Sequence, residues 1–78
     1  MENKVTKPTE KHFYDDEIEK TMQRFFYSLN EKERRRYAGL EALKIGHGGQ
    51  DYIAEILGCS RRTVNRGARE VIDLPKKK

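Results

Sequence analysis

The segment that decides the expected fold is 50–72, which reads QDYIAEILGCSRRTVNRGAREVI. Its first part predicts a short amphipathic helix with the apolar residues Tyr52, Ile53, Ile56 and Leu57. Gly58 and Cys59 then form a tight turn, and Ser60 is expected to cap a second helix. The apolar face of that second helix carries Val64, Ala68 and Val71. Two helices joined by a short turn with a glycine predict a helix-turn-helix, whose second helix can enter the major groove of DNA.

The second helix of this pair carries the candidate DNA-binding residues. At 100° per residue, with Val64 in the core, three arginines fall within about 40° of the opposite pole, and Asn65 lies on a flank at about 100°. Arg can bind guanine bidentately, Asn can bind adenine, and Ser or Thr at a helix start can bind phosphate. A solvated basic face is the alternative, but the position on the second helix favours DNA binding. The residues expected to bind DNA are Ser60, Arg61, Arg62, Thr63, Asn65, Arg66 and Arg69.

Upstream of this pair, the sequence predicts a helix that begins near Asp15. Its apolar stripe consists of Ile18, Met22, Phe25, Phe26 and Leu29. The acidic residues that crowd its first turn are Asp15, Asp16, Glu17 and Glu19. We interpret them as a helix start and not as a metal or acid–base site, because no His or Cys is suitably spaced.

Asn30 and Glu33 form a variant of the capping box and predict a further helix over about 31–45. Apolar residues on two sides of this helix indicate that it packs between neighbours. One side has Tyr37, Leu40 and Leu43, and the nearly opposite side has Ala38, Ala42 and Ile45. Arg34, Arg35 and Arg36 either contact phosphate or form a solvated face, and the sequence leaves both interpretations open. Gly46 is expected to end the helix in the left-handed C-cap conformation.

Three isolated residues give weaker signals. Gly67 departs from the larger apolar residue that is usual at its position in the second helix of a helix-turn-helix. It either weakens the helix by about 1 kcal/mol relative to Ala or permits the close approach of a neighbouring helix. Cys59 is interpreted as a small, half-buried turn residue without a redox role. His47 has no partner residues that favour a metal site.

Composition and charge exclude several classes of protein. The 78 residues include 17 Lys or Arg and 13 Asp or Glu, and seven basic but only two acidic side chains fall in residues 60–78, which suggests a polyanionic partner. No apolar run approaches the ~20 residues of a membrane span, so no membrane partner is expected. The one cysteine excludes an intrachain disulfide and a multi-cysteine zinc site and indicates an intracellular protein. No nucleophile–base pair or metal set is visible, so neither catalysis, nor a cofactor, nor a small-molecule substrate is expected.

The expected architecture is all-α, with about four helices, no strand and a C-terminal helix-turn-helix over about 50–72. Residues 1–12 lack apolar periodicity and predict a disordered arm. Residues 13–74 form the expected helical DNA-binding domain. Residues 75–78 form a basic tail.

The run LNEKERRRYAGLEALKIGHGGQDYIAEILGCSRRTVNRGARE, from Leu29 to Glu70, resembles the N-terminal region of DDE-type insertion-sequence transposases of the Rhodopirellula transposase family. The most specific part is RRRYAGLEALKIGHGG followed by YIAEILGCSRRTV. The resemblance implies a region that binds the terminal repeats of the element and precedes a catalytic domain with an RNase-H-like fold and three metal-binding carboxylates. Those acids have no counterpart in this chain, so strand transfer is not expected of it.

The expected function is therefore sequence-specific binding of double-stranded DNA, as the end-recognition domain of an insertion-sequence transposase without its catalytic domain. A protein of this kind would act in the cytoplasm of a prokaryote, at the nucleoid. One alternative is a small helix-turn-helix transcriptional regulator that occludes a promoter. The other is a helical protein-interaction module, in which the stripe of the first helix pairs with a partner or with a second copy in a homodimer.

Overall fold

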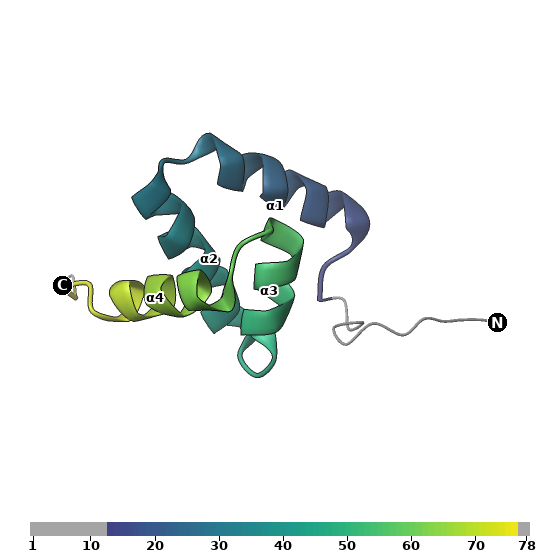
Figure 1. Ribbon diagram of the computed structural model, residues 1–78. Helices are drawn as coiled ribbons and strands as arrows, with labels where there is room; N and C mark the ends of the chain where they lie inside the picture. Colours follow the sequence, from purple (N-terminus) through teal and green to yellow (C-terminus); the bar gives the residue numbers. More distant parts are fainter. Residues whose placement is uncertain (1–12, 77–78) are drawn as a thin grey trace.

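The computed structural model describes residues 13–76, which form four helices and no strand (Figure 1). The helices are α1 (Asp16–Ser28), α2 (Glu31–Ile45), α3 (Gly49–Leu57) and α4 (Arg61–Ile72). The predicted all-α architecture with a C-terminal helix-turn-helix is confirmed, since α3 and α4 are joined by only three residues. The arm predicted over residues 1–12 and the last two residues of the basic tail lie outside the described residues.

Side chains cap the N-termini of three helices, and the sequence predicts the caps at Asn30 and Ser60. The Asp15 carboxylate accepts a hydrogen bond from the Ile18 amide at 2.9 Å, and the Ser60 hydroxyl accepts one from the Thr63 amide at 3.1 Å. The capping box of α2 is complete: Asn30 Oδ1 accepts from the Glu33 amide at 2.9 Å, and the Asn30 amide donates to Glu33 Oε1 at 3.5 Å. These caps satisfy amides that have no partner within the helix.

The turn after α2 differs in detail from the prediction. Gly46 has φ +87° and ψ −131°, a positive φ outside the left-handed helical region that was expected for it. The left-handed conformation occurs instead at Gly48, before α3, and at Gly58, after α3. The Gly46 amide still donates to the Ala42 carbonyl at 2.9 Å, so α2 ends where the sequence indicates, but the chain leaves it in a different direction.

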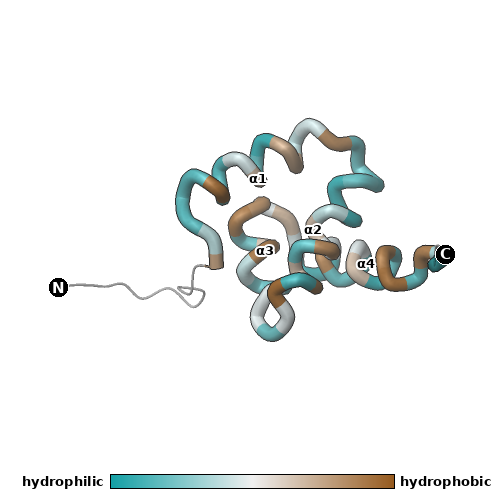
Figure 2. Tube along the Cα trace, turned by 180° about the vertical axis from the view of Figure 1, so that it is seen from behind, coloured by the Kyte–Doolittle hydropathy of each residue, from teal (hydrophilic) through white to brown (hydrophobic). Residues whose placement is uncertain are grey.

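Helix α2 is the central element, because it contacts each of the other three helices. Helix α1 lies across α2 and α3, and α4 runs beside α2 and leads to the C-terminus (Figures 1 and 2). The side chains of Ile53, Leu57 and Val64 are fully buried and join α3 to α4. The core of the helix-turn-helix is therefore the one that its apolar pattern predicts.

Only part of the apolar stripe of α1 enters the core. Met22 and Phe26 are buried, and Phe26 is only 4% exposed. Ile18 and Phe25 are 46% and 50% exposed, so the apolar stripe indicated by the sequence is only partly buried. The reason is that α1 contacts α2 and α3 along one narrow line and has no contact with α4 in the described part of the chain. Phe25 packs its ring edge-to-face on Tyr37, with centroids 5.0 Å apart.

Polar contacts hold α1 in place where apolar contacts are few. The Tyr27 hydroxyl donates to the Leu57 carbonyl at 3.2 Å, and Gln23 donates to the Ile56 carbonyl at 2.9 Å. Both carbonyls lie in the last turn of α3, where backbone acceptors lack partners within the helix. Side chains of α1 thus cap the C-terminus of α3 and fix the two helices relative to each other.

Helix α2 buries its small side chains and not its leucines. Ala38, Gly39 and Ala42 are buried, whereas Leu40 and Leu43 are each 43% exposed. The prediction of two apolar packing faces is therefore wrong for the face that carries the leucines. The physical reason is that the backbones of α3 and α4 approach α2 on the side of its small residues, and the leucines lie outside these contacts.

The close approach of α4 to α2 occurs at two glycines. A Cβ atom added to Gly39 would lie 2.0 Å from the backbone nitrogen of Ala68, and one added to Gly67 would lie 1.6 Å from the carbonyl oxygen of Arg35. Both distances are far below van der Waals contact, and both obstacles are backbone atoms that cannot rotate away. Of the two roles that the sequence left open for Gly67, the structure thus supports the close approach of a neighbouring helix.

The variant Gly67→Ala tests this crossing. In an open helix, Ala is favoured over Gly by about 1 kcal/mol. Here the added methyl group forces α2 and α4 apart, so we expect the free energy of unfolding to fall by about 3 kcal/mol or more. Urea unfolding followed by circular dichroism measures the change.

The matched control is Asn65→Ala on the exposed face of the same helix. It gains helix propensity without meeting another helix, so stability should stay unchanged or rise by up to about 0.7 kcal/mol. Equal stabilities for the Gly67→Ala and Asn65→Ala variants would contradict the close crossing.

Candidate nucleic-acid interface

The candidate DNA-binding residues lie on the exposed side of α4 and at its N-terminus. Val64 faces the core and is fully buried. Thr63 is half-buried, and the other candidates are exposed, namely Ser60, Arg61, Arg62, Asn65, Arg66 and Arg69. The cap at Ser60 sets the start of the helix and so determines which of these side chains point outward.

The arginines of this face differ in their intramolecular partners. Arg61 pairs with Asp51 of α3 at 2.9 Å, and Arg66 pairs with Glu70 at 3.5 Å. Arg62 and Arg69 have no hydrogen bond or ion pair with any residue between 13 and 76. The whole guanidinium groups of Arg62 and Arg69 are therefore open to an external anion.

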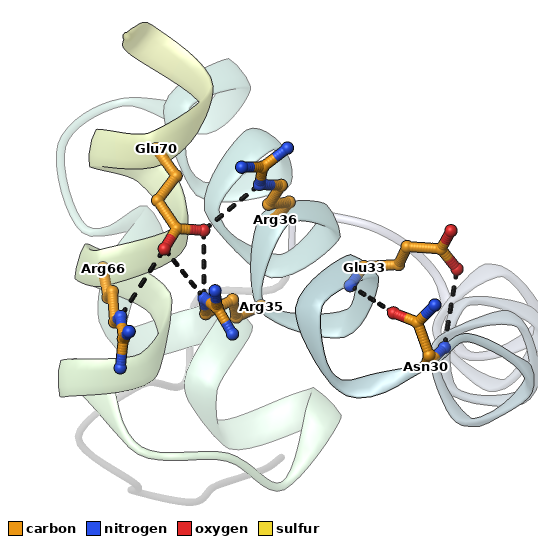
Figure 3. A network of polar contacts seen from close by, with 6 residues as sticks. All are labelled: Asn30, Glu33, Arg35, Arg36, Arg66 and Glu70. Atoms are coloured by element: carbon orange, nitrogen blue, oxygen red, sulfur yellow. Dashed lines mark hydrogen bonds and ion pairs between the residues drawn. The ribbon is translucent and has the colours of Figure 1, made fainter. Parts of the chain in front are cut away.

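Glu70 joins α4 to α2 through a cluster of arginines (Figure 3). Its carboxylate accepts hydrogen bonds from Arg35 Nε at 2.9 and 3.0 Å and from Arg36 Nε at 3.2 Å, and it also pairs with Arg66. Desolvation alone would raise the pKa of Glu70, but the hydrogen bonds and charges of Arg35 and Arg36 outweigh it and lower the pKa below its usual value. The carboxylate is therefore ionised at neutral pH.

Arg34 has a structural role at the junction of α1 and α2. Its Nε donates to the Phe26 carbonyl at 3.1 Å, and its Nη2 donates to the Tyr27 carbonyl at 2.9 Å. The guanidinium group also lies over the rings of Phe26 and Tyr27. It thus caps the C-terminus of α1. A purely solvated face, one of the two interpretations left open for residues 34–36, does not describe these arginines.

Surface hollows lie on both sides of the exposed face of α4. One has a volume of ≈ 330 Å³ and lies between α4, the α3–α4 turn and the junction of α1 and α2; we call it the corner pocket. The arginines that line the corner pocket are Arg34, Arg35, Arg62 and Arg66. The other hollow, of ≈ 500 Å³, is lined by Asn65, Ala68, Arg69, Ile72 and Asp73. The structure therefore places Arg62 and Arg66 on one side of the exposed face of α4, and Asn65 and Arg69 on the other side.

The sequence did not indicate Glu70 as a partner of these arginines, and it left phosphate contact or a solvated face as the alternatives for Arg34 and Arg35. Arg35 and Glu70 are 35 residues apart in the chain, and no local pattern connects them. The i to i+4 spacing of Arg66 and Glu70 was the only local signal of an ion pair at this position.

Other chemistries have little support within residues 13–76. No group of three or more His, Cys, Asp or Glu side chains there is placed to hold a metal ion. Cys59 is half-buried, and burial raises the pKa of its thiol, which disfavours the reactive thiolate. None of the four helices is both long and apolar enough to cross a membrane.

Comparison of the chain with protein-family models, with curated proteins and with solved structures finds no match. The resemblance to transposases therefore stays an interpretation of the sequence.

From the contacts of Glu70 with the three arginines around it, we predict a specific dependence of the stability of the fold on pH. Because the folded state lowers the pKa of Glu70, its contribution is complete above the usual carboxyl pKa of 4.5 and is lost as the pH falls through the lowered value. Glu70→Gln lacks this contribution at every pH. The difference in melting temperature between the parent chain and the variant should therefore be largest near neutral pH and should shrink in acid.

Thermal melts between roughly pH 7 and pH 3 measure this difference. The control is Glu17→Gln in the first turn of α1, which removes the same charge from a residue with no described ion pair. A difference between the parent chain and Glu70→Gln that stays constant with pH would show that the carboxylate charge does not stabilise the fold.

Proposed function

We propose that this chain binds double-stranded DNA and that α4 enters the major groove. The observation that carries the proposal is a pair of guanidinium groups, Arg62 and Arg69, which have no partner among residues 13–76 and lie on the exposed side of the second helix of a helix-turn-helix. Positive charge without an internal partner attracts the phosphates, and an exposed helix fits the width of the major groove.

The shape of the domain supports this orientation. Val64 and Gly67 lie on the buried side of α4, so the opposite side of this helix is the one open to a ligand. The C-terminal part of α4 extends away from α3 (Figure 1), and Ile72 there is exposed. Neither α1 nor α3 therefore blocks the approach of a duplex to this helix.

The two flanks of α4 offer different chemistry to DNA. On one flank, Asn65 can bind adenine through its amide, and the apolar Ile72 in the same hollow can contact a thymine methyl group. On the other flank, Arg62 and Arg66 can bind guanine or phosphate. We assign base recognition mainly to Arg62, Asn65 and Arg66, and we assign phosphate binding to Ser60, Thr63 and Arg69 and to the basic residues that follow the helix.

A narrower role rests on the sequence resemblance alone. We propose that the chain corresponds to the end-recognition region of an insertion-sequence transposase and acts by binding, without catalysing strand transfer. A small transcriptional regulator would use the same surface and would differ only in its genomic target. Either protein would act at the nucleoid in the cytoplasm of a prokaryote.

A protein-interaction module is supported by a different observation. Ile18 and Phe25 on α1, and Leu40 and Leu43 on α2, are large apolar side chains that remain exposed. A homodimer that covers them would shield this surface from water. Sedimentation equilibrium of the chain and of its Phe25→Asp variant distinguishes this role, because only a dimer through this surface would dissociate in the variant.

Selection of binding sites from random duplexes, followed by titration of the selected site, tests DNA binding. We expect affinity to fall with salt at a log–log slope of about −0.9 per phosphate contact. Arg62→Ala and Asn65→Ala should each cost about 1–3 kcal/mol on the selected site and should relax the preference at one base pair.

Lys20→Ala is the matched control, since it removes a positive charge from the exposed surface of α1 and should leave the preference unchanged. Affinity that does not depend on salt would exclude electrostatic DNA binding. An equal loss on every duplex for both α4 variants would show that α4 does not recognise the sequence.

A further inference from the structure

We propose that the corner pocket binds one phosphodiester group of the DNA backbone and thereby sets the register of α4 in the major groove. This inference rests on the proposed function and assigns a specific ligand group to a site that includes α2 and the junction of α1 with α2. Arg35 of α2 is the principal phosphate ligand in this proposal, and Arg62 and Arg66, which we assign mainly to the bases, add their positive charge to the lining of the pocket. Phosphates position a protein on the duplex but carry no sequence information.

Charge is the first argument for a phosphate. Four guanidinium groups line the corner pocket, two from α2 (Arg34 and Arg35) and two from α4 (Arg62 and Arg66). The one carboxylate in the lining is that of Glu31, which is exposed and has no described partner. Glu70 lies close by and neutralises part of the positive charge. The lining itself keeps an excess of positive charge, which the negative charge of a phosphodiester group would complement.

The hydrogen-bond donors of these arginines are the second argument. The contacts that hold the fold use both Nε and Nη2 of Arg34, but only the Nε atoms of Arg35 and Arg66. The terminal nitrogens of Arg35, Arg62 and Arg66 have no acceptor among residues 13–76. Internal contacts thus fix the direction of Arg35 while its outer N–H groups remain available. A guanidinium held in this way can bind phosphate oxygens bidentately without the entropic cost of ordering a free side chain.

The position of the pocket is the third argument. The α3–α4 turn and Thr63, in the first turn of α4, form part of its lining, so the positive end of the helix dipole also faces the ligand. The pocket lies between α4 and the body of the domain, on the flank opposite Asn65. When α4 enters the major groove, this flank faces one strand of the backbone, so its contact fixes how deep and at which base step the helix sits.

The same position gives α1 a function beyond stability. Arg34 caps the C-terminus of α1 and lines the pocket, so the junction of α1 with α2 forms one of the pocket walls. The capping box at Asn30 begins α2 at this junction and orients its first turns. A three-helix domain without α1 would lack this wall.

Thr63→Glu tests the pocket without weakening the helix. Glu at this position completes a capping box with Ser60, so α4 should remain folded. Its carboxylate would lie at the edge of the pocket, beside the first turn of α4, and repel a phosphate there. Thr63→Gln is the matched control, because it has the same shape and capping ability but no charge. We expect Thr63→Glu to bind the selected duplex about tenfold more weakly than Thr63→Gln does.

A scan with methylphosphonate linkages locates the phosphate. Each linkage of the selected duplex is replaced in turn by a neutral one, and the affinities of Thr63→Glu and Thr63→Gln are compared. We expect their difference to vanish when one particular linkage, at the edge of the major groove that α4 occupies, is neutral. It should persist for neutral linkages elsewhere.

Glu31→Gln provides an independent test of the pocket. Glu17→Gln is its control, because it also removes one carboxylate. Glu31→Gln should strengthen binding to all duplexes several-fold and leave the consensus unchanged, because it removes the one carboxylate of the pocket lining. An equal effect of the two variants would contradict the pocket.

The outcomes separate this proposal from the function on which it rests. If the parent chain binds no duplex, the proposed function fails. If it binds with a consensus, but the two Thr63 variants differ equally at every neutral linkage or not at all, DNA binding stands and the phosphate site in the pocket is wrong.

Discussion

The contact between the backbones of α2 and α4 at Gly39 and Gly67 is the constraint on which the rest of the structure depends. No side chain larger than hydrogen fits at either position, because the neighbouring atoms belong to the other helix's backbone. The approach brings the N-terminal half of α2 beside the second half of α4. The position of Arg35 next to Glu70 follows from it.

This contact also determines the electrostatics of the exposed face. Arginines of α2 are drawn to within hydrogen-bond distance of Glu70, whose carboxylate also holds Arg66. Glu70 is thereby occupied by internal contacts, so it opposes the positive charge of α4 less than an isolated carboxylate would. Within the described part of the chain, Arg62 and Arg69 have no partner. The domain thus uses part of its basic residues for its fold and presents the others on one helix.

The sequence was sufficient for features that depend on near neighbours. The capping box at Asn30, the cap at Ser60 and the limits of α2 depend on residues three or four positions apart, and the structure confirms them. It was insufficient where two distant segments meet. The exposure of Phe25 and the ion pairs of Glu70 depend on how the helices are placed in space, which the helical period does not encode. Gly67 allowed two interpretations until the carbonyl of Arg35 was located beside it.

The central claim is that α4, held against α2 by this crossing, presents the DNA-binding surface together with the junction of α1 and α2. Backbone amide chemical shifts of the isotope-labelled chain, followed by NMR during titration with the selected duplex, test it most directly. The account predicts the largest shifts at residues 60–69 and at residues 27–35. Largest shifts at residues 16–24 of α1, with residues 60–69 unchanged, would contradict it.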